Sequence, residues 1–139
     1  MFAYGQTAAN AIAVMSYLAA DPSRRAGSGE IAEARRISRA LTAKLLTQLA
    51  AARFVTGQPG PGGGYTLAKS PGEISLLDVA SLFEQTDLPS RCPYGPGWCG
   101  NGDPCPLHHN IHELTIVNRR FMEETRFSVF QKSQITIEN

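Results

Sequence analysis

The stretch GSGEIAEARRISRALTAKLLTQLAAARFV, residues 27–55, decides the fold of this chain. Ser28 is placed to cap a short helix over about residues 29–36, and Ser38 is placed to cap a second helix over about residues 39–53. Two short helices joined by so tight a turn predict a helix-turn-helix. The apolar residues that recur at helical spacing, and that we expect to face inward, are Ile31, Ala34, Leu41, Leu45, Leu46 and Leu49.

The second of these helices has a polar outer face close to its N-terminus. Seven basic residues and only two acidic ones fall between residues 24 and 53, although the whole chain has a net charge of +1. This basic half indicates a surface for a polyanion, and an ordinary helical hairpin with solvated surfaces is the alternative. The residues placed to enter a DNA major groove are Arg39, Ala40, Thr42, Ala43 and Lys44. Ser28 and Ser38, at the helix starts, are further candidate DNA contacts.

Two short apolar segments follow at residues 54–56 and 65–67, and a glycine- and proline-rich tip lies between them at residues 57–64. A hairpin directly after a helix-turn-helix is typical of a wing. A nucleotide-binding P-loop is disfavoured because neither a lysine nor a helix follows the glycine run. Glycines let backbone amides approach a DNA phosphate closely. The candidate DNA contacts of the wing are Gly62, Gly63, Gly64 and Tyr65.

Three further helices are predicted around this unit. The first covers about residues 8–20 with Thr7 as its cap, the second covers residues 74–83 and starts at Ser75, and a long third covers about residues 106–127. Because so long a helix overhangs a small domain, its apolar stripe packs either within the chain or against a second copy about a twofold axis. The residues of this stripe are Ile111, Leu114, Val117 or Asn118, and Phe121. The sequence therefore predicts a mainly α fold with a small β-hairpin wing.

The chain contains no run of about eighteen apolar residues, so we expect no membrane-spanning helix. Its apolar N-terminus is not preceded by the basic residues of a secretory signal, which predicts a cytoplasmic protein. Three cysteines are an odd number, and in that setting they favour metal ligation over disulfide bonds.

All three cysteines stand in the segment RCPYGPGWCGNGDPCPLHH, residues 91–109. Its many glycines and prolines do not suit a helix or a central strand. Three thiolates and an imidazole that close on a metal would order such a loop. An iron–sulfur cluster and a zinc ion are both open, and the wide spacing of the cysteines favours iron. A catalytic thiolate is disfavoured because no Cys-His-Asn arrangement is apparent.

Several motifs together resemble the winged-helix regulators of the IscR, NsrR and RirA type. They are IAEARRIS, LLTQLAAARFV and GPGGGY within residues 31–65, ISLLDV at residues 74–79, the three-cysteine loop and the closing long helix. The resemblance covers essentially the whole chain. It implies a dimeric bacterial transcription factor, not an enzyme, that binds double-stranded DNA at a palindromic operator. In the cluster-bearing members the cysteines hold an iron–sulfur cluster whose state sets the affinity for DNA.

The chain departs from that family pattern at two places. The gap between Cys92 and Cys99 is six residues, where the family usually shows five. Ala43 and Pro59 stand where IscR-like members have a glutamate and an arginine that help to read DNA. We therefore expect an operator sequence different from the one that IscR reads.

The resemblance also implies the fourth cluster ligand. IscR-like members use a histidine three residues after the last cysteine, and here that residue is His108, with His109 and His112 as alternatives. The aspartate that NsrR-like members use has no counterpart, because Ala9 and Asn10 stand there, which leaves only Asn10 or water on that side. Three thiolates and one imidazole suit a 2Fe–2S cluster, and a 4Fe–4S cluster on the same residues is open. The implied ligand set is Cys92, Cys99, Cys105 and His108.

The expected organisation has four parts. They are a winged helix-turn-helix domain at residues 1–87, a cluster-binding loop at residues 88–109, a dimerisation helix at residues 106–130 and a tail at residues 131–139. The expected function is that of a transcriptional regulator, most simply a repressor, which responds to redox state, nitric oxide or iron–sulfur status. The alternatives are a cluster-free regulator of the same fold and a zinc-stapled adaptor that binds another protein.

Overall fold

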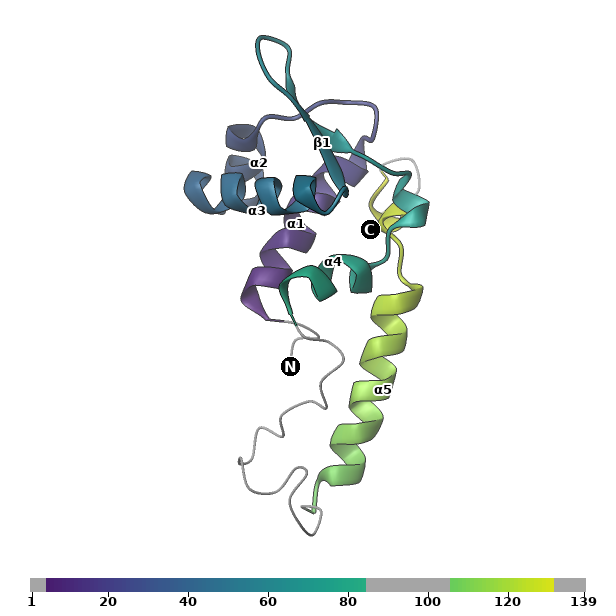
Figure 1. Cartoon of the computed structure of the whole chain (residues 1–139). Helices are drawn as coiled ribbons and strands as arrows, with labels where there is room; N and C mark the ends of the chain where they lie inside the picture. Colours follow the sequence, from purple (N-terminus) through teal and green to yellow (C-terminus); the bar gives the residue numbers. More distant parts are fainter. Residues whose placement is uncertain (1–4, 85–105, 132–139) are drawn as a thin grey trace, which may run out of the picture.

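The computed structural model describes residues 5–84 and 106–131, and its architecture confirms the predicted fold class (Figure 1). Helices dominate, and β1 (Val55–Gln58) and β2 (Gly64–Leu67) form one antiparallel hairpin that projects from the helical body, with Val55 opposite Leu67 and Gln58 opposite Gly64. In chain order the elements are α1 (Gln6–Ala20), α2 (Ser28–Arg35), α3 (Arg39–Ala51), β1 (Val55–Gln58), β2 (Gly64–Leu67), the 3-10 turn η1 (Pro71–Glu73), α4 (Leu76–Phe83), α5 (His108–Glu124) and the 3-10 turn η2 (Phe127–Phe130).

The core of the molecule is built around α1. This helix contacts α2, α3, α4, β2 and η2, and small residues such as Ala8 and Ala11 let the neighbouring elements come close to it. Its larger residues Met15 and Leu18 are buried in the same core as the leucines of α3. Burial of such side chains stabilises a fold by roughly 1.5–3 kcal/mol each, so α1 holds the surrounding helices and the hairpin together.

Two of the predicted helix caps are confirmed, and two are wrong. Ser38 accepts a hydrogen bond from the Leu41 amide at 3.2 Å, and Ser75 forms a capping box with Asp78. Ser28 is instead the first residue of α2 and Gly27 is its N-cap, because Ala26 pairs with Tyr65 and keeps the chain extended up to that point. Thr7 likewise lies inside α1, whose N-cap is Gly5.

The inward faces differ from the prediction at four positions. Thr42 is 0% exposed, so the prediction that it faces DNA is wrong. It shares the i, i+3, i+4, i+7 stripe with the buried leucines of α3, while Leu41 lies at the margin of the core. In α2 the buried residues are Ile31, as predicted, and Ala32. Ala34, which we expected inside, is exposed because only one side of this short helix faces α1 and α3.

Helix α5 forms a long arm that extends away from the helical body (Figure 1). It begins two residues later and ends three residues earlier than predicted. Among the described residues of α5, only Met122 is buried.

The predicted continuation of the helix to Phe127 is wrong, because the chain turns back into the core there. Leu76 donates its amide proton to the Thr125 carbonyl at 2.9 Å, and Phe127 donates to the Ile74 carbonyl at 2.9 Å. The Phe127 side chain is 0% exposed.

Candidate nucleic-acid interface

The turn between α2 and α3 sets the angle at which α3 leaves the body. Arg36 closes α2 in the left-handed backbone region, with φ 54° and ψ 45°, which only a small fraction of non-glycine residues adopt. The Ile37 amide then donates to the Ala32 carbonyl at 3.0 Å, and Ser38 returns the chain to an extended conformation before α3 begins. This arrangement leaves the Arg36 side chain exposed beside the start of α3.

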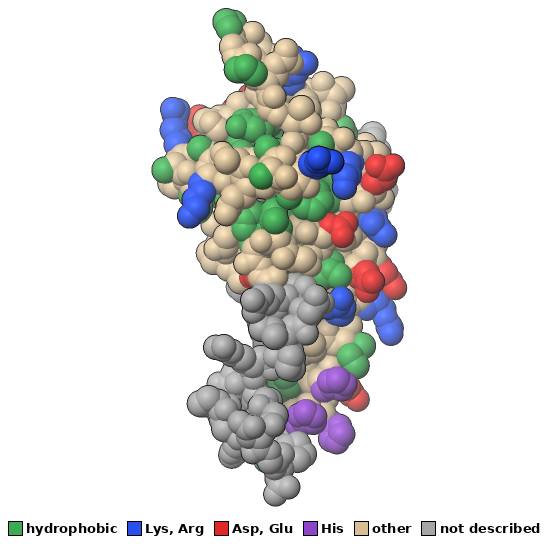
Figure 2. Space-filling view, viewed as in Figure 1, with side chains coloured by type: hydrophobic (Ala, Val, Ile, Leu, Met, Phe, Trp, Pro, Cys, Tyr) green, Lys and Arg blue, Asp and Glu red, His purple; other side chains and the backbone are tan. Residues whose placement is uncertain are grey.

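The outer face of α3 carries four of the predicted DNA contacts. Arg39, Ala40, Ala43 and Lys44 are exposed as predicted. Thr47 and Gln48 continue the same face, and sequence reasoning missed them although they lie four residues after Ala43 and Lys44. Figure 2 shows Lys and Arg side chains at the edge of the molecule beside α2 and α3, and others on the opposite side.

Arg39 also joins α3 to the N-terminal turn of α2. Its guanidinium lies within 3.6–3.8 Å of the position that a Cβ on Gly29 would take. The first amides of a helix have no partner within the helix and carry its positive dipole end. The first turn of α2, where Ser28 is half-buried, and Arg39 thus form one edge suited to a phosphate.

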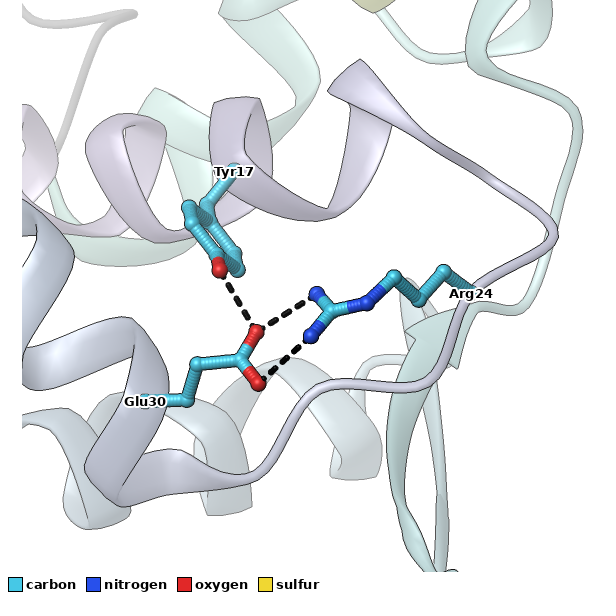
Figure 3. Close-up of polar contacts among 3 residues, drawn as sticks. All are labelled: Tyr17, Arg24 and Glu30. Carbon is cyan, nitrogen blue, oxygen red and sulfur yellow. Dashed lines mark hydrogen bonds and ion pairs between the residues drawn. The ribbon is translucent and has the colours of Figure 1, made fainter.

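Two of the seven basic residues bind other residues of the same chain. Arg24 binds both carboxylate oxygens of Glu30, at 2.6 and 2.8 Å, and the Tyr17 hydroxyl donates to the same carboxylate (Figure 3). The Arg24 guanidinium and then the Tyr17 hydroxyl hold the pKa of Glu30 below its usual range. Arg35 donates to the Ala13 carbonyl at 3.0 Å and also bonds the Ser16 hydroxyl, which ties α2 to α1.

The other five basic residues of this region have exposed side chains. Within residues 5–84 and 106–131, the structure gives them no ion pair, and Arg24 with Glu30 is the salt bridge found there. Their charge is therefore available for a polyanion. They are Arg25, Arg36, Arg39, Lys44 and Arg53.

The wing is held in shape by its glycines and by Tyr65. A Cβ on Gly63 would lie 2.1 Å from the Gln58 carbonyl oxygen, and one on Gly64, with φ at +136°, would lie 2.9 Å from the Ala26 backbone. The Tyr65 amide and carbonyl both bond Ala26, at 2.8 and 3.1 Å, and its ring lies over Gly57. The visible role of Tyr65 is thus to fasten the wing to the segment before α2.

The wing tip could contact a phosphate through backbone amides rather than through charged side chains. Gly62 is exposed with φ at +77°, while the Gly63 amide already donates to the Gly60 carbonyl at 2.9 Å. The tip, residues 57–64, contains no lysine or arginine, and Lys69 at the wing base lies 5.4 Å over the Phe54 ring. A phosphate at the tip would therefore be bound by amide groups, chiefly near Gly62.

The candidate metal ligands divide into two groups. Cys92, Cys99 and Cys105 lie outside the described residues. His108 is described, and it is the exposed first residue of α5, with the His109 and His112 rings beside it. The donor set of three thiolates and one imidazole is chemically suited to an iron–sulfur cluster.

An exposed apolar stripe runs along α5. In the single chain Leu114 is 51% exposed, Val117 is 62% exposed and Phe121 is 52% exposed, while Ile111 is half-buried. These residues follow the predicted three- and four-residue spacing. Contiguous apolar surface of this kind marks an interaction site more often than plain solvent-facing surface.

No helix within the described parts of the chain is long and apolar enough to cross a membrane.

A family model and two relatives of known class resemble this chain in sequence. Residues 4–132 match the model of the Rrf2 family, described as an iron-dependent transcriptional regulator. An HTH-type transcriptional regulator of Aquifex aeolicus is 31% identical over 124 residues, which is 88% of this chain and 86% of that protein. The IscR regulator of Cronobacter sakazakii is 35% identical over 86 residues, 62% of this chain and 52% of IscR, so that match spans about half of the relative.

Solved structures of the same fold include two regulators. CymR of B. subtilis, described as its global cysteine regulator, superimposes with a TM-score of 0.75 at 16% identity, covering 98% of this chain and all of CymR. IscR of T. potens gives a TM-score of 0.71 at 17% identity, covering 96% of this chain and 92% of the other. At such low identity these likenesses concern the fold, which is that of a winged-helix regulator.

Proposed function

The chain belongs to the Rrf2 family of transcriptional regulators, and we propose that it is a DNA-binding repressor controlled by an iron–sulfur cluster. The family match and the relatives make it a regulator of transcription rather than an enzyme. The observation that carries the DNA-binding site is the exposed basic edge formed by Arg39, Lys44 and the first turn of α2. Arg24 and Arg35 are excluded from that edge because they bind within the molecule.

The recognition unit would be a homodimer in the cytoplasm. Two copies that pair through the exposed stripe of α5 about a twofold axis would bury Leu114, Val117 and Phe121. Such a pair presents two α3 helices to successive major grooves of a palindromic operator, with the wings on the flanking backbone. Val117→Asp tests this arrangement, because a charge in the stripe should shift the protein from dimer to monomer in sedimentation at micromolar concentration. A dimer unaffected by Val117→Asp would contradict it.

The ligands that we propose for the cluster are Cys92, Cys99, Cys105 and His108. Support comes from the donor types, the iron-dependent description of the family and the IscR relatives. When bound, the group supplies a redox- and iron-responsive change of charge, and a 2Fe–2S type suits this ligand set best.

Helix α5 connects the proposed cluster ligand His108 to the core of the protein. His108 is its first residue, and at its other end Thr125 and Phe127 bond the backbone around Ile74. A rigid helix of this length transmits a displacement of its first turn to the core beside α1. A differential stabilisation of a few kcal/mol between two positions of the helix is enough to change DNA occupancy by orders of magnitude.

DNA binding is tested with charge-matched variants. Lys44→Ala and Arg39→Ala should each weaken binding to duplex DNA and lower the slope of log K against log salt by roughly one unit per lost phosphate contact. Arg126→Ala removes an exposed arginine after α5 and should leave both quantities unchanged. Equal effects of all three substitutions would mean that only net charge matters and that α3 is not the reading surface.

The cluster is tested by optical spectroscopy and metal analysis. Protein purified without oxygen should be coloured and contain iron and inorganic sulfide, and His108→Ala should make the colour labile. Colourless protein that holds zinc would favour a zinc-stapled chain, and metal-free protein that still binds its operator would favour a cluster-free regulator. Unchanged cluster stability in His108→Ala would move the fourth ligand to His109 or His112.

A further inference from the structure

Three histidines stand at the beginning of α5, and the proposed cluster uses one of them. His108, His109 and His112 are all exposed and gather at the far end of the α5 arm (Figure 2). The His108 and His112 rings lie 6.2 Å apart between centroids and within 4° of parallel. The His109 ring meets His108 edge-on, at 5.8 Å and 72°. His108 and His112 thus share one helix face, while His109 points to a neighbouring one.

We propose that His108 and His112 form a chelating site for a divalent late transition metal ion such as Cu²⁺, Ni²⁺ or Zn²⁺. Imidazole nitrogens are good ligands for these ions, and two of them one helical turn apart can bind the same ion. The first turn that holds them is formed, since the Ile111 amide donates to the Leu107 carbonyl at 2.9 Å. The chelate therefore requires little ordering beyond the two side-chain rotamers.

The expected coordination is two imidazoles and water. Within residues 5–84 and 106–131 no group of three or more His, Cys, Asp or Glu side chains is arranged to hold a metal ion. The ion would also sit near the positive end of the α5 dipole, which weakens its binding. The site should therefore be a moderate one, with Cu²⁺ bound most tightly of the three ions because it stands at the peak of the stability order.

The chelate has a regulatory consequence that rests on the proposed function. His108 belongs both to this pair and to the proposed cluster ligands, and its ring cannot serve both at once. A metal ion held by His108 and His112 withdraws His108 from the loop, so an excess of divalent metal should oppose cluster retention. His112 takes part in the chelate alone, which makes it the residue that separates the two roles.

The chelate itself is tested in full-length protein with Cys92, Cys99 and Cys105 all changed to Ser, titrated with Ni²⁺ by calorimetry. His112→Ala should lower the Ni²⁺ affinity by at least about tenfold, since one of two ligands is lost. His109→Ala removes an imidazole from the same turn and should change the affinity by less than about twofold. Absence of Ni²⁺ binding, or an equal loss in both variants, overturns the proposal. The same comparison in the native chain with alkylated cysteines decides the matter if the triple variant does not fold.

The competition is tested separately in cluster-loaded protein challenged with Ni²⁺. The visible absorbance should decay at least about threefold faster in the native chain than in His112→Ala, which keeps His108. Equal decay in both overturns the regulatory role. If no cluster can be loaded at all, the proposed function fails, and the calorimetric comparison still decides whether the chelate exists.

Discussion

The buried hydroxyl of Thr42 leads to a prediction that separates stability from DNA binding. Thr42 is 0% exposed, and its Oγ1 has no hydrogen-bond partner among the described residues. An unpaired buried hydroxyl costs roughly 1–3 kcal/mol relative to solvent. Thr42→Val replaces it with a methyl group of similar shape and similar helix propensity. The free energy of unfolding should rise by about 1–2 kcal/mol, and the melting temperature by roughly 4 °C per kcal/mol for a chain of this size.

The assay is urea or thermal unfolding at one fixed protein concentration, because the proposed dimerisation would make the melting temperature depend on concentration. Thr47→Val is the matched control, since Thr47 lies on the same helix but is exposed and bonds the Ala43 carbonyl at 2.9 Å. Its effect on stability should stay within about 0.5 kcal/mol. DNA affinity should not change in Thr42→Val, because the side chain does not reach the surface. A less stable Thr42→Val protein, or one that binds DNA more weakly, would refute the reasoning.

Three other substitutions test the wing, the core and the ion pair. Gly63→Ala should distort the wing tip and weaken DNA binding in a gel-shift assay, because the added Cβ would clash with the Gln58 carbonyl oxygen. Gly72→Ala is the control, since nothing lies within 4 Å of its added Cβ, and it should bind DNA normally. Phe127→Ala should lower the free energy of unfolding by about 3–5 kcal/mol, because this side chain is fully buried. Val129→Ala changes a nearby side chain that is about half exposed and should lower the free energy of unfolding far less. Similar urea midpoints for the two variants would contradict the burial of Phe127 in the core. Glu30→Gln should be less stable than the native chain above pH 4.5, because the lowered pKa of Glu30 in the folded state contributes stability there. The difference in the free energy of unfolding between the two proteins should shrink as the pH falls below 4.5. A difference that persists at low pH would exclude the Arg24–Glu30 pair as its source.

The local elements were largely readable from the chain, because they depend on neighbours in sequence. Helical spacing of the α3 leucines, the polar cap at Ser38 and the capping box at Ser75 act within one turn, so pattern alone located them. The glycines of the wing predict a hairpin turn for the same reason, because turn geometry also depends on residues adjacent in sequence. The resemblance to a regulator family rested on these elements and on the cysteine spacing, and the family match confirms it.

Which side chains are free to act was decided only by the tertiary structure. Seven basic residues look alike in sequence, yet Arg24 binds Glu30 and Arg35 binds α1, while Arg39 and Lys44 have no ion pair among the described residues. Likewise Thr42 is as polar as Thr47, but packing against α1 and α2 buries one and leaves the other in solvent. Sequence periodicity determines that a helix has two faces, whereas contacts between distant segments determine which face meets the core and which remains for DNA.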